Sequence, residues 1–295
     1  MVLSRVRQAA EYTIVQELHE EKGYPICKLC LLVGVSRASY YKWLNREKSK
    51  LELENETLLE TIKQLHAEHK GILGCERMTM YVNKSGEVHY NVKRIRRVMG
   101  CGGIKCVIRR KRPSYIRSSP QITAENTLNR DFSANASNKK WLTDVTELKY
   151  GSGQKAYLSA ILDLGDRRIV AWELGHSNNN PLVFKTLKKA AVLNPGAKPL
   201  LHSDRGFQYT SKVFKTILDT AGIAQSMSRV GRCIDNGPME GFWGILKSEM
   251  YYLNHFKTYE KLETAVANYI DYYNNKRLQK RLECMSPMEY HNSIA

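Results

Sequence analysis

Hydrophobic residues recur at helical spacing through the first third of the chain. Residues 2–21 carry apolar side chains on one face, which predicts an amphipathic helix. Residues 26–44 predict a helix-turn-helix, in which Gly34 supplies the turn and Ser36 the N-cap of the second helix. Residues 45–60 are polar, a solvated linker or helix, and further helices are expected over 58–69, 77–81 and 90–99.

From residue 141 onward the apolar pattern changes to that of strands alternating with helices. Residues 141–148 alternate with period two, and we expect further strands at 156–163, 168–174, 199–203 and 224–227. Helices are expected at 180–192, 211–221 and 259–273, and another begins at Pro238. Three antiparallel strands followed by strands that alternate with helices predict a mixed α/β sheet.

The chain is strongly basic, with a formal net charge of +17. Residues 1–140 hold 26 Lys and Arg against 14 Asp and Glu, which gives +12, and the remainder holds 20 against 15, which gives +5. This excess favours a polyanionic partner, of which nucleic acid is the commonest inside a cell. No apolar run approaches the roughly 20 residues that span a bilayer, and the N-terminus lacks an apolar signal region, so we expect a cytoplasmic protein without a membrane partner.

Three carboxylates stand where the predicted sheet can bring them together. Asp144 lies inside the first strand, Asp204 follows the strand at 199–203, and Glu240 lies in the first turn of the helix that begins at Pro238. Converging carboxylates need cations, and oxygen ligands select Mg²⁺ or Mn²⁺. Glu240 taken alone also fits an acid that stabilises a helix dipole.

The residues around these acids resemble the D,D,35-E core of retroviral-integrase-like transposases. The resemblance lies in residues 141–146, 202–209 and 235–240, with Lys247 seven residues after Glu240. It is closest to the second-frame (OrfB) subunit of bacterial insertion-sequence transposases, and it runs over roughly residues 20–293.

The resemblance implies a fold, a reaction and a cofactor. The fold is a ribonuclease H-like mixed-sheet core preceded by small all-α helix-turn-helix units. The reaction is metal-dependent phosphodiester cleavage and strand transfer at the element's ends, with Asp144, Asp204 and Glu240 as catalytic metal ligands for two Mg²⁺ or Mn²⁺ ions. Lys247 would contact the transposon end, although a plain helix-face charge is the alternative.

Pattern, charge and resemblance together divide the chain into four parts. We expect a helical region with a helix-turn-helix at 1–50, a second small helical DNA-binding unit with a basic arm at 51–112, a linker at 113–138, and the catalytic core with C-terminal helices at 139–295.

Candidate DNA contacts lie on the helical units and the arm. The second helix of the first unit presents Arg37, Tyr40 and Lys42. The helix at 90–99 and the arm after it add a basic run that contains no acid from Lys93 to Arg117, and its candidate contacts are Lys93, Arg94, Arg96, Arg97, Arg109, Arg110, Lys111 and Arg112. A solvated charged face is the alternative for this run.

Two other functions remain open on the sequence. One is a nuclease or resolvase with the same core but no strand transfer, and the other is a DNA-binding regulator that uses the helix-turn-helix alone. For a transposase we expect transposon ends and target DNA as partners, a homo-oligomer on DNA, and a first-frame subunit or frameshift fusion as a further partner. The terminal repeats, the target preference and the oligomeric state do not follow from these residues.

Overall fold

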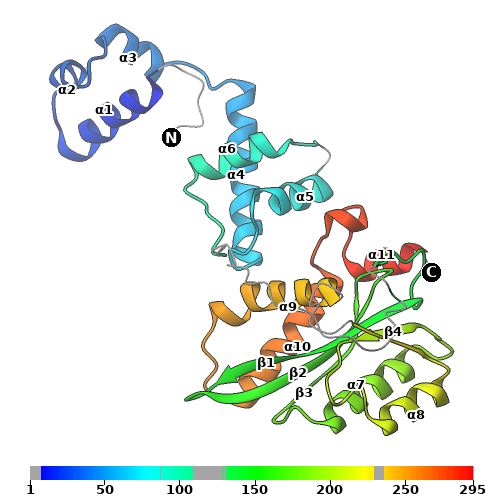
Figure 1. Ribbon diagram of the computed structural model, residues 1–295. Coiled ribbons are helices and arrows are strands. Elements are labelled where there is room, and N and C mark those ends of the chain that lie inside the picture. Colours follow the sequence, from blue (N-terminus) through cyan, green and yellow to red (C-terminus); the bar gives the residue numbers. More distant parts are fainter. Residues whose placement is uncertain (1–7, 87, 109–127, 129–130, 229–235, 295) are drawn as a thin grey trace, which may run out of the picture. The chain divides into compact units, whose positions relative to one another are not determined.

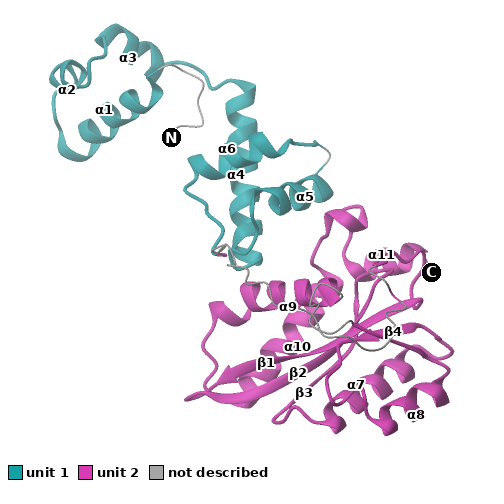
Figure 2. Ribbon diagram, in the orientation of Figure 1, with its two compact units in different colours: residues 1–107 teal, residues 108–295 magenta. Residues whose placement is uncertain are grey.

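The computed structural model describes residues 8–86, 88–108, 128, 131–228 and 236–294. The chain divides into two compact units, residues 1–107 and residues 108–295 (Figure 2). Each unit has its own buried apolar residues, and each is described by itself below.

The first three helices form a small bundle. They are α1 (Ala9–Lys22), α2 (Ile26–Val33) and α3 (Arg37–Leu44). Gly34 adopts a φ of 76°, and Ser36 caps α3 by accepting a hydrogen bond from the Ser39 N–H, so the predicted helix-turn-helix is present. Ala9 of the predicted apolar face is buried in α1 together with Tyr12 and Val15, whereas Ile14, which the prediction places on the same face, is 46% exposed. Val2 and Val6 lie outside the described residues.

Three more helices complete the first unit: α4 (Lys50–Glu68), α5 (Cys75–Ser85) and α6 (Val92–Cys101). A capping box between Ser49 and Glu52 starts α4, so most of the stretch predicted as a linker or helix is helix. The three helices bury apolar side chains at helical spacing: Leu58, Ile62, Met78, Val82, Ile95 and Val98.

The second unit is built on a five-stranded mixed sheet in the order β3-β2-β1-β4-β5. The strands are β1 (Lys140–Tyr150), β2 (Gln154–Asp163), β3 (Ile169–Gly175), β4 (Leu200–Ser203) and β5 (Ala224–Met227). The first three pair antiparallel, and β4 and β5 add in parallel next to β1. This is the mixed sheet that the sequence predicts, with the topology of a ribonuclease H-like core.

Helices cover both faces of the sheet (Figure 1). One face is covered by α7 (Asn180–Leu193) and α8 (Lys212–Ala221), the other by α9 (Gly237–Glu249) and α10 (Tyr259–Asn275). The chain ends with the short helices η2 (Tyr251–Leu253) and η3 (Lys280–Leu282) and with α11 (Pro287–Ile294). Alternation along β1 sends Trp141 and Val145 to the α7–α8 face, and Leu142 and Leu148 to the α9–α10 face.

The segment predicted as a linker contributes to this core. Leu128 is 2% exposed within the α9–α10 cluster, and its backbone N–H donates to Ser226 Oγ at 3.2 Å. Phe132 and Ala134 pack against the same cluster. Leu128, Phe132 and Ala134 therefore act as part of the sheet unit rather than as a linker, because their apolar side chains pack against its hydrophobic cluster.

Candidate active site

The register between β1 and β4 places two of the three predicted acids side by side. Lys140, Trp141 and Leu142 pair in parallel with Leu200, Leu201 and His202. Continued along both strands, this register sets Asp144 next to Asp204, just beyond the end of β4. Parallel partners point to the same face, which here is the one that α9 and α10 cover.

Asp144 lies in the seam between β1 and α9. Its carboxylate accepts a hydrogen bond from the Trp243 indole N–H at 3.0 Å and another from the Val145 backbone N–H. Burial raises the pKa of Asp144 to about 6, and the charges of Asp204 and Glu240 act in the same direction. The two hydrogen bonds oppose this rise because they stabilise the ionised form.

Asp204 is held in a tight turn after β4. The Gly206 backbone N–H donates to Asp204 Oδ1 at 2.9 Å. A Cβ at Gly206 would lie 3.1 Å from that oxygen and 2.8 Å from Gln208 Oε1, so a larger residue would have to displace these side-chain atoms. Asp204 is exposed to solvent, while the hydrogen bond from the Gly206 N–H holds its carboxylate in the turn.

Tyr209 supports the strands beneath this turn. Its hydroxyl lies 3.4 Å from Thr143 Oγ1, and its ring is 2% exposed among the side chains of the α7–α8 face. Burial raises the pKa of Tyr209, and the carboxylates of Asp144 and Asp204 raise it further, so the phenol stays neutral.

Glu240 lies in the first turn of α9, where Pro238 begins the helix as the sequence predicts. Its side chain is exposed, and partial burial raises its pKa. Among the described residues, no group of three or more His, Cys, Asp and Glu side chains lies close enough together to hold a metal ion. The acids therefore face the same region without forming a closed metal-binding cluster.

Lys247 lies on the same helix and near the same acids. Its side chain is half-buried, less exposed than the sequence pattern indicates. Desolvation lowers its pKa, and the carboxylates of Glu147 and Asp144 act against that change. The ammonium group thus lies in the field of Asp144, two turns along α9 from Glu240.

Asn236 joins the start of α9 to β1. It occupies the N-cap position, but its side chain makes no capping bond, and its Nδ2 donates instead to the Thr143 carbonyl oxygen at 3.2 Å. The sequence pointed to Asn236 only as a residue that orders the loop, and to Trp243 only as an apolar helix position. The available signal was that Trp243 follows Glu240 by three residues, on the same helix face.

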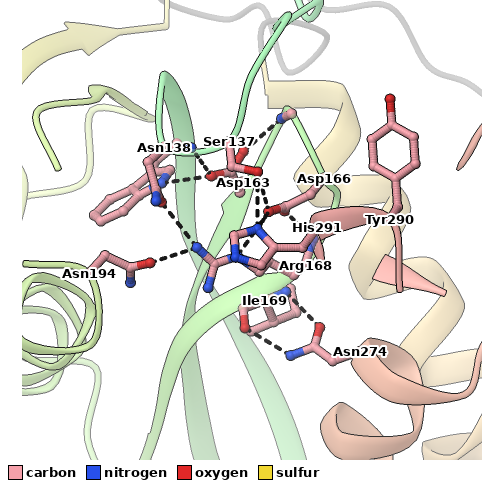
Figure 3. Close-up of polar contacts among 12 residues, drawn as sticks. Ser137, Asn138, Asp163, Asp166, Arg168, Ile169, Asn194, Asn274, Tyr290 and His291 are labelled. Carbon is pink, nitrogen blue, oxygen red and sulfur yellow. Dashed lines mark hydrogen bonds and ion pairs between the residues drawn. The ribbon is translucent and has the colours of Figure 1, made fainter. Parts of the chain in front are cut away.

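Other polar residues near this part of the sheet are structural. Asp163 and Asp166 are both fully buried (Figure 3). Asp163 accepts from the Asn138 and Gly165 backbone N–H groups, and Asp166 binds Arg168 and His291. This network fastens the β2–β3 turn to α11.

His202 is likewise a packed strand histidine. Both of its ring nitrogens bond to serine hydroxyls, of Ser226 and Ser228, so it ties β4 to β5.

One of the candidate DNA contacts on α3 is wrong. Tyr40 is only 1% exposed, because its ring packs against Tyr12 and Trp43 in the centre of the three-helix bundle. It cannot reach DNA from that position. Arg37 and Lys42 of the same helix are exposed.

The basic residues of α6 fall into two groups. Lys93, Arg96 and Arg97 are exposed. Arg94 is instead bound to α4, with its guanidinium 2.8 Å from Glu54 Oε2 and 3.0 Å from Asn55 Oδ1. A hollow of about 390 Å³ opens beside them, lined by Leu51, Asn91, Lys93, Arg94 and Arg97.

The candidate contacts on the basic arm, Arg109, Arg110, Lys111 and Arg112, lie outside the described residues.

Residues 277–281 contain three basic side chains, of which one is structural. Arg277 is buried and forms an ion pair with Glu249 at 2.8 Å. Glu249 also accepts from the Tyr269 hydroxyl at 3.0 Å. Arg277 therefore fixes the end of α9 to α10 and is not a free surface charge.

None of the described helices combines the length and the apolar character that crossing a membrane requires.

Three family models match the chain. The model described as Integrase core domain matches residues 134–233, and a second model with the same description matches residues 240–294. The HTH-like domain model matches residues 52–112. The two integrase matches together contain Asp144, Asp204 and Glu240.

Two relatives match most of their own length. An Escherichia coli K12 protein, named as the transposase InsK for insertion sequence element IS150, is 37% identical over 273 residues, which are 91% of this chain and 94% of the relative. The transposase for insertion sequence element IS904 of Lactococcus lactis is 34% identical over 250 residues, covering 84% of this chain and 98% of the relative. Among solved structures, the HTLV-2 integrase catalytic core domain in complex with magnesium has 20% identity and a TM-score of 0.43 over 53% of this chain and 97% of its own.

Proposed function

Because the chain belongs to the family of insertion-sequence transposases with an integrase core, we propose that Asp144, Asp204 and Glu240 are its catalytic residues. The chain is a DNA transposase, a polynucleotidyl transferase of the DDE type. Its substrates are the ends of its element and a target DNA, and its reaction is the cutting and joining of phosphodiester bonds in the cytoplasm.

The three acids fit a divalent metal by their chemistry. All three offer carboxylate oxygens, the donors that Mg²⁺ and Mn²⁺ prefer. Asp204 and Glu240 both raise the pKa of Asp144, because their negative charges disfavour a further one beside them. A cation would relieve that repulsion, so we propose that Asp144, Asp204 and Glu240 would together hold the metal ions. Two such ions supply activation of a hydroxyl nucleophile and stabilisation of the leaving oxygen.

The chain's own residues would prepare this centre. Gly206 and the Val145 N–H hold Asp204 and Asp144 respectively, and α9 carries Glu240 towards them.

DNA binding would be shared among several basic surfaces. Lys247 lies on the same helix as Glu240 and within the influence of the Asp144 charge, and it would contact the element's end. Arg37 and Lys42 on α3, and Lys93, Arg96 and Arg97 on α6, are exposed cations suited to phosphate or base edges. The basic arm at 109–112 would add phosphate contacts. A homo-oligomer on DNA, with a first-frame subunit or a frameshift fusion, completes the proposed assembly.

The observation that carries this proposal is the β1–β4 register, which sets Asp144 beside Asp204 under the helix that bears Glu240. Its test is a set of amide variants: Asp144→Asn, Asp204→Asn and Glu240→Gln. Each should reduce strand transfer from a labelled 3′-hydroxyl end by at least about 100-fold, because each removes a charged metal ligand.

The matched control is Asp219→Asn, which alters an exposed ion pair with Lys215 on α8. It should transfer strands at the parental rate. DNA affinity, measured by gel shift, should be parental in all four variants. If one of the three acid variants transfers strands at near the parental rate, the corresponding acid is not a metal ligand.

A further inference from the structure

We propose that Trp243 is a positioning residue, whose indole N–H orients Asp144 so that Asp144 and Glu240 can serve one metal centre. This inference rests on the metal-dependent function proposed above and adds to it a residue that acts through Asp144. It concerns the seam between β1 and α9, where the strand that carries one acid meets the helix that carries another.

The contact itself is a buried bond to a carboxylate. Trp243 Nε1 donates to Asp144 Oδ2 at 3.0 Å, and Trp243 is only 6% exposed. A bond from N–H to an ionised oxygen is charge-assisted, so it fixes direction more strongly than a neutral bond. Trp243 follows Glu240 by three residues, hence the two side chains share one face of α9. Helix α9 therefore carries Glu240 and also donates a hydrogen bond to Asp144.

Core packing alone explains only part of this arrangement. The Trp243 ring lies 5.1 Å from the Phe242 ring within the apolar cluster of α9 and α10. Packing accounts for the burial of the ring, and a buried indole N–H needs some acceptor. Packing does not explain why the acceptor of this N–H is Asp144, the acid whose carboxylate lies in the field of Asp204 and Glu240.

A second bond fixes α9 to the same strand on the other side of Glu240. Asn236 is 4% exposed, and its amide donates to the carbonyl of Thr143, the residue before Asp144. Asparagine at an N-cap commonly bonds its own helix, yet this one bonds β1 instead. Apolar packing is non-directional. Two directed bonds, one before and one after Glu240, therefore set its position along β1.

Two substitutions at Trp243 separate the hydrogen bond from the packing. Trp243→Phe keeps an aromatic ring and removes the donor. Trp243→Gln removes the ring but keeps an N–H donor, because the glutamine Nε2 stands three bonds from Cβ, as the indole Nε1 does. The matched control is Trp172→Phe, since Trp172 also packs on this cluster but its ring lies beside Lys189 rather than an acid.

The readout is Mn²⁺ binding to the full chain by calorimetry, with the melting temperature without metal measured alongside. Trp243→Phe should bind Mn²⁺ about 10- to 100-fold more weakly than the parent, the usual cost of losing a group that orients a metal ligand. Trp243→Gln should bind more tightly than Trp243→Phe although it melts at a lower temperature. Trp172→Phe should bind with the parental affinity.

The opposite order would overturn the proposal. If Mn²⁺ affinity follows packing, with Phe equal to the parent and Gln weaker than Phe, then Trp243 is only a core residue. If the parent itself binds no Mn²⁺, the metal site proposed above fails, which is a separate result.

A measurement on the unaltered protein guards against a variant that does not fold. The chain has four tryptophans, so selective ¹⁵N labelling gives four indole N–H signals. Mg²⁺ should shift one of them along the same binding curve that calorimetry gives. No shifted indole signal at saturating Mg²⁺ would also overturn the proposal.

Discussion

Asp144 is ionised at a cost to the folded protein. Burial, with the charges of Asp204 and Glu240, raises its pKa to about 6 from an ordinary value of 3.8. The folded state therefore binds a proton that the unfolded state has released between about pH 4 and pH 6. The free energy of unfolding falls as the pH rises through that window, and the loss is complete above about pH 6. Without a bound cation, the ionised Asp144 carboxylate therefore lowers the free energy of unfolding.

Replacing Asp144 with Asn should remove this cost. At pH 7.5 without metal, Asp144→Asn should be more stable than the parent by about 1–3 kcal/mol, since each pKa unit corresponds to about 1.4 kcal/mol. The difference should disappear below about pH 4, where both side chains are neutral. Thermal melts across pH 3.5–8 would measure it.

Magnesium should reverse the order of stability in that experiment. It binds the folded parent and raises its melting temperature, whereas the variant lacks a ligand and gains less. A variant that is less stable than the parent at pH 7.5 without metal would show that Asp144 has a structural role.

Helices α6 and α9 each divide their polar residues between structure and function. On α9, Asn236 and Trp243 bond to β1, while Glu249 bonds to Arg277 at the far end. Glu240 and Lys247 are left to face the acid site. On α6, Arg94 bonds to α4, whereas Lys93, Arg96 and Arg97 are exposed, and Arg96 Nη2 also donates to Cys75 Sγ at 3.7 Å. A basic helix is therefore not uniformly a DNA-binding surface.

We expect the exposed and the bonded arginines of α6 to behave differently. Arg96→Ala and Arg97→Ala should weaken binding to terminal-repeat DNA, because each removes a cation that neutralises a phosphate. The slope of log K against log salt should fall by about 1 for each phosphate left without its cation. Arg94→Ala should mainly lower the melting temperature, because it unpairs Glu54 and Asn55. Fluorescence anisotropy over a salt series and circular dichroism melts would separate the two effects.

The matched comparison is Arg94→Ala against Arg96→Ala, the same substitution two positions apart. If both variants reduce the salt slope equally and neither changes the melting temperature, then Arg94 and Arg96 do not differ in role as proposed.

We expect the two compact units to separate DNA recognition from catalysis along the chain. Residues 1–107 hold the six helices with most of the exposed candidate DNA contacts, and residues 108–295 hold the sheet and the three acids. Leu128 belongs to the second unit by its burial. The boundary of an independently folding core therefore lies before Leu128.

Two fragments test where the catalytic unit begins. A fragment of residues 108–295 should fold and bind Mn²⁺ but lose its preference for terminal-repeat DNA, because the helical units are gone. A fragment of residues 135–295 should melt at a lower temperature, since removing a buried leucine costs about 2–5 kcal/mol. Calorimetry, melting curves and gel shifts with terminal-repeat and unrelated DNA provide the measurements.

Leu128→Ala in the longer fragment is the control for the second claim, because it removes only the buried side chain. Equal melting temperatures for both fragments would show that Leu128 contributes nothing to the core. Terminal-repeat selectivity in the fragment of residues 108–295 would contradict the separation of units.

The amino-acid pattern is enough to predict the strands and helices and to propose the three acids as candidates. Periodicity is a local property, so the five strands and the helices that follow them could be predicted near their observed bounds. Gly34 and Ser36 predicted the turn and the cap because each acts on its own backbone. The three acids could be proposed from the sequence because the motif around each of them is short and local, whereas their role as metal ligands stays a prediction.

Only the tertiary structure decided what each polar or aromatic side chain meets. Tyr40, Arg94 and Arg277 look like surface residues in the sequence, yet each lies against a partner distant in the chain or on another helix. Leu128 and Trp243 find their roles in the same way, through Ser226 and Asp144. Such contacts depend on how whole elements pack, and no local pattern encodes them, so the support of the acid site appears only once β1 and α9 lie side by side.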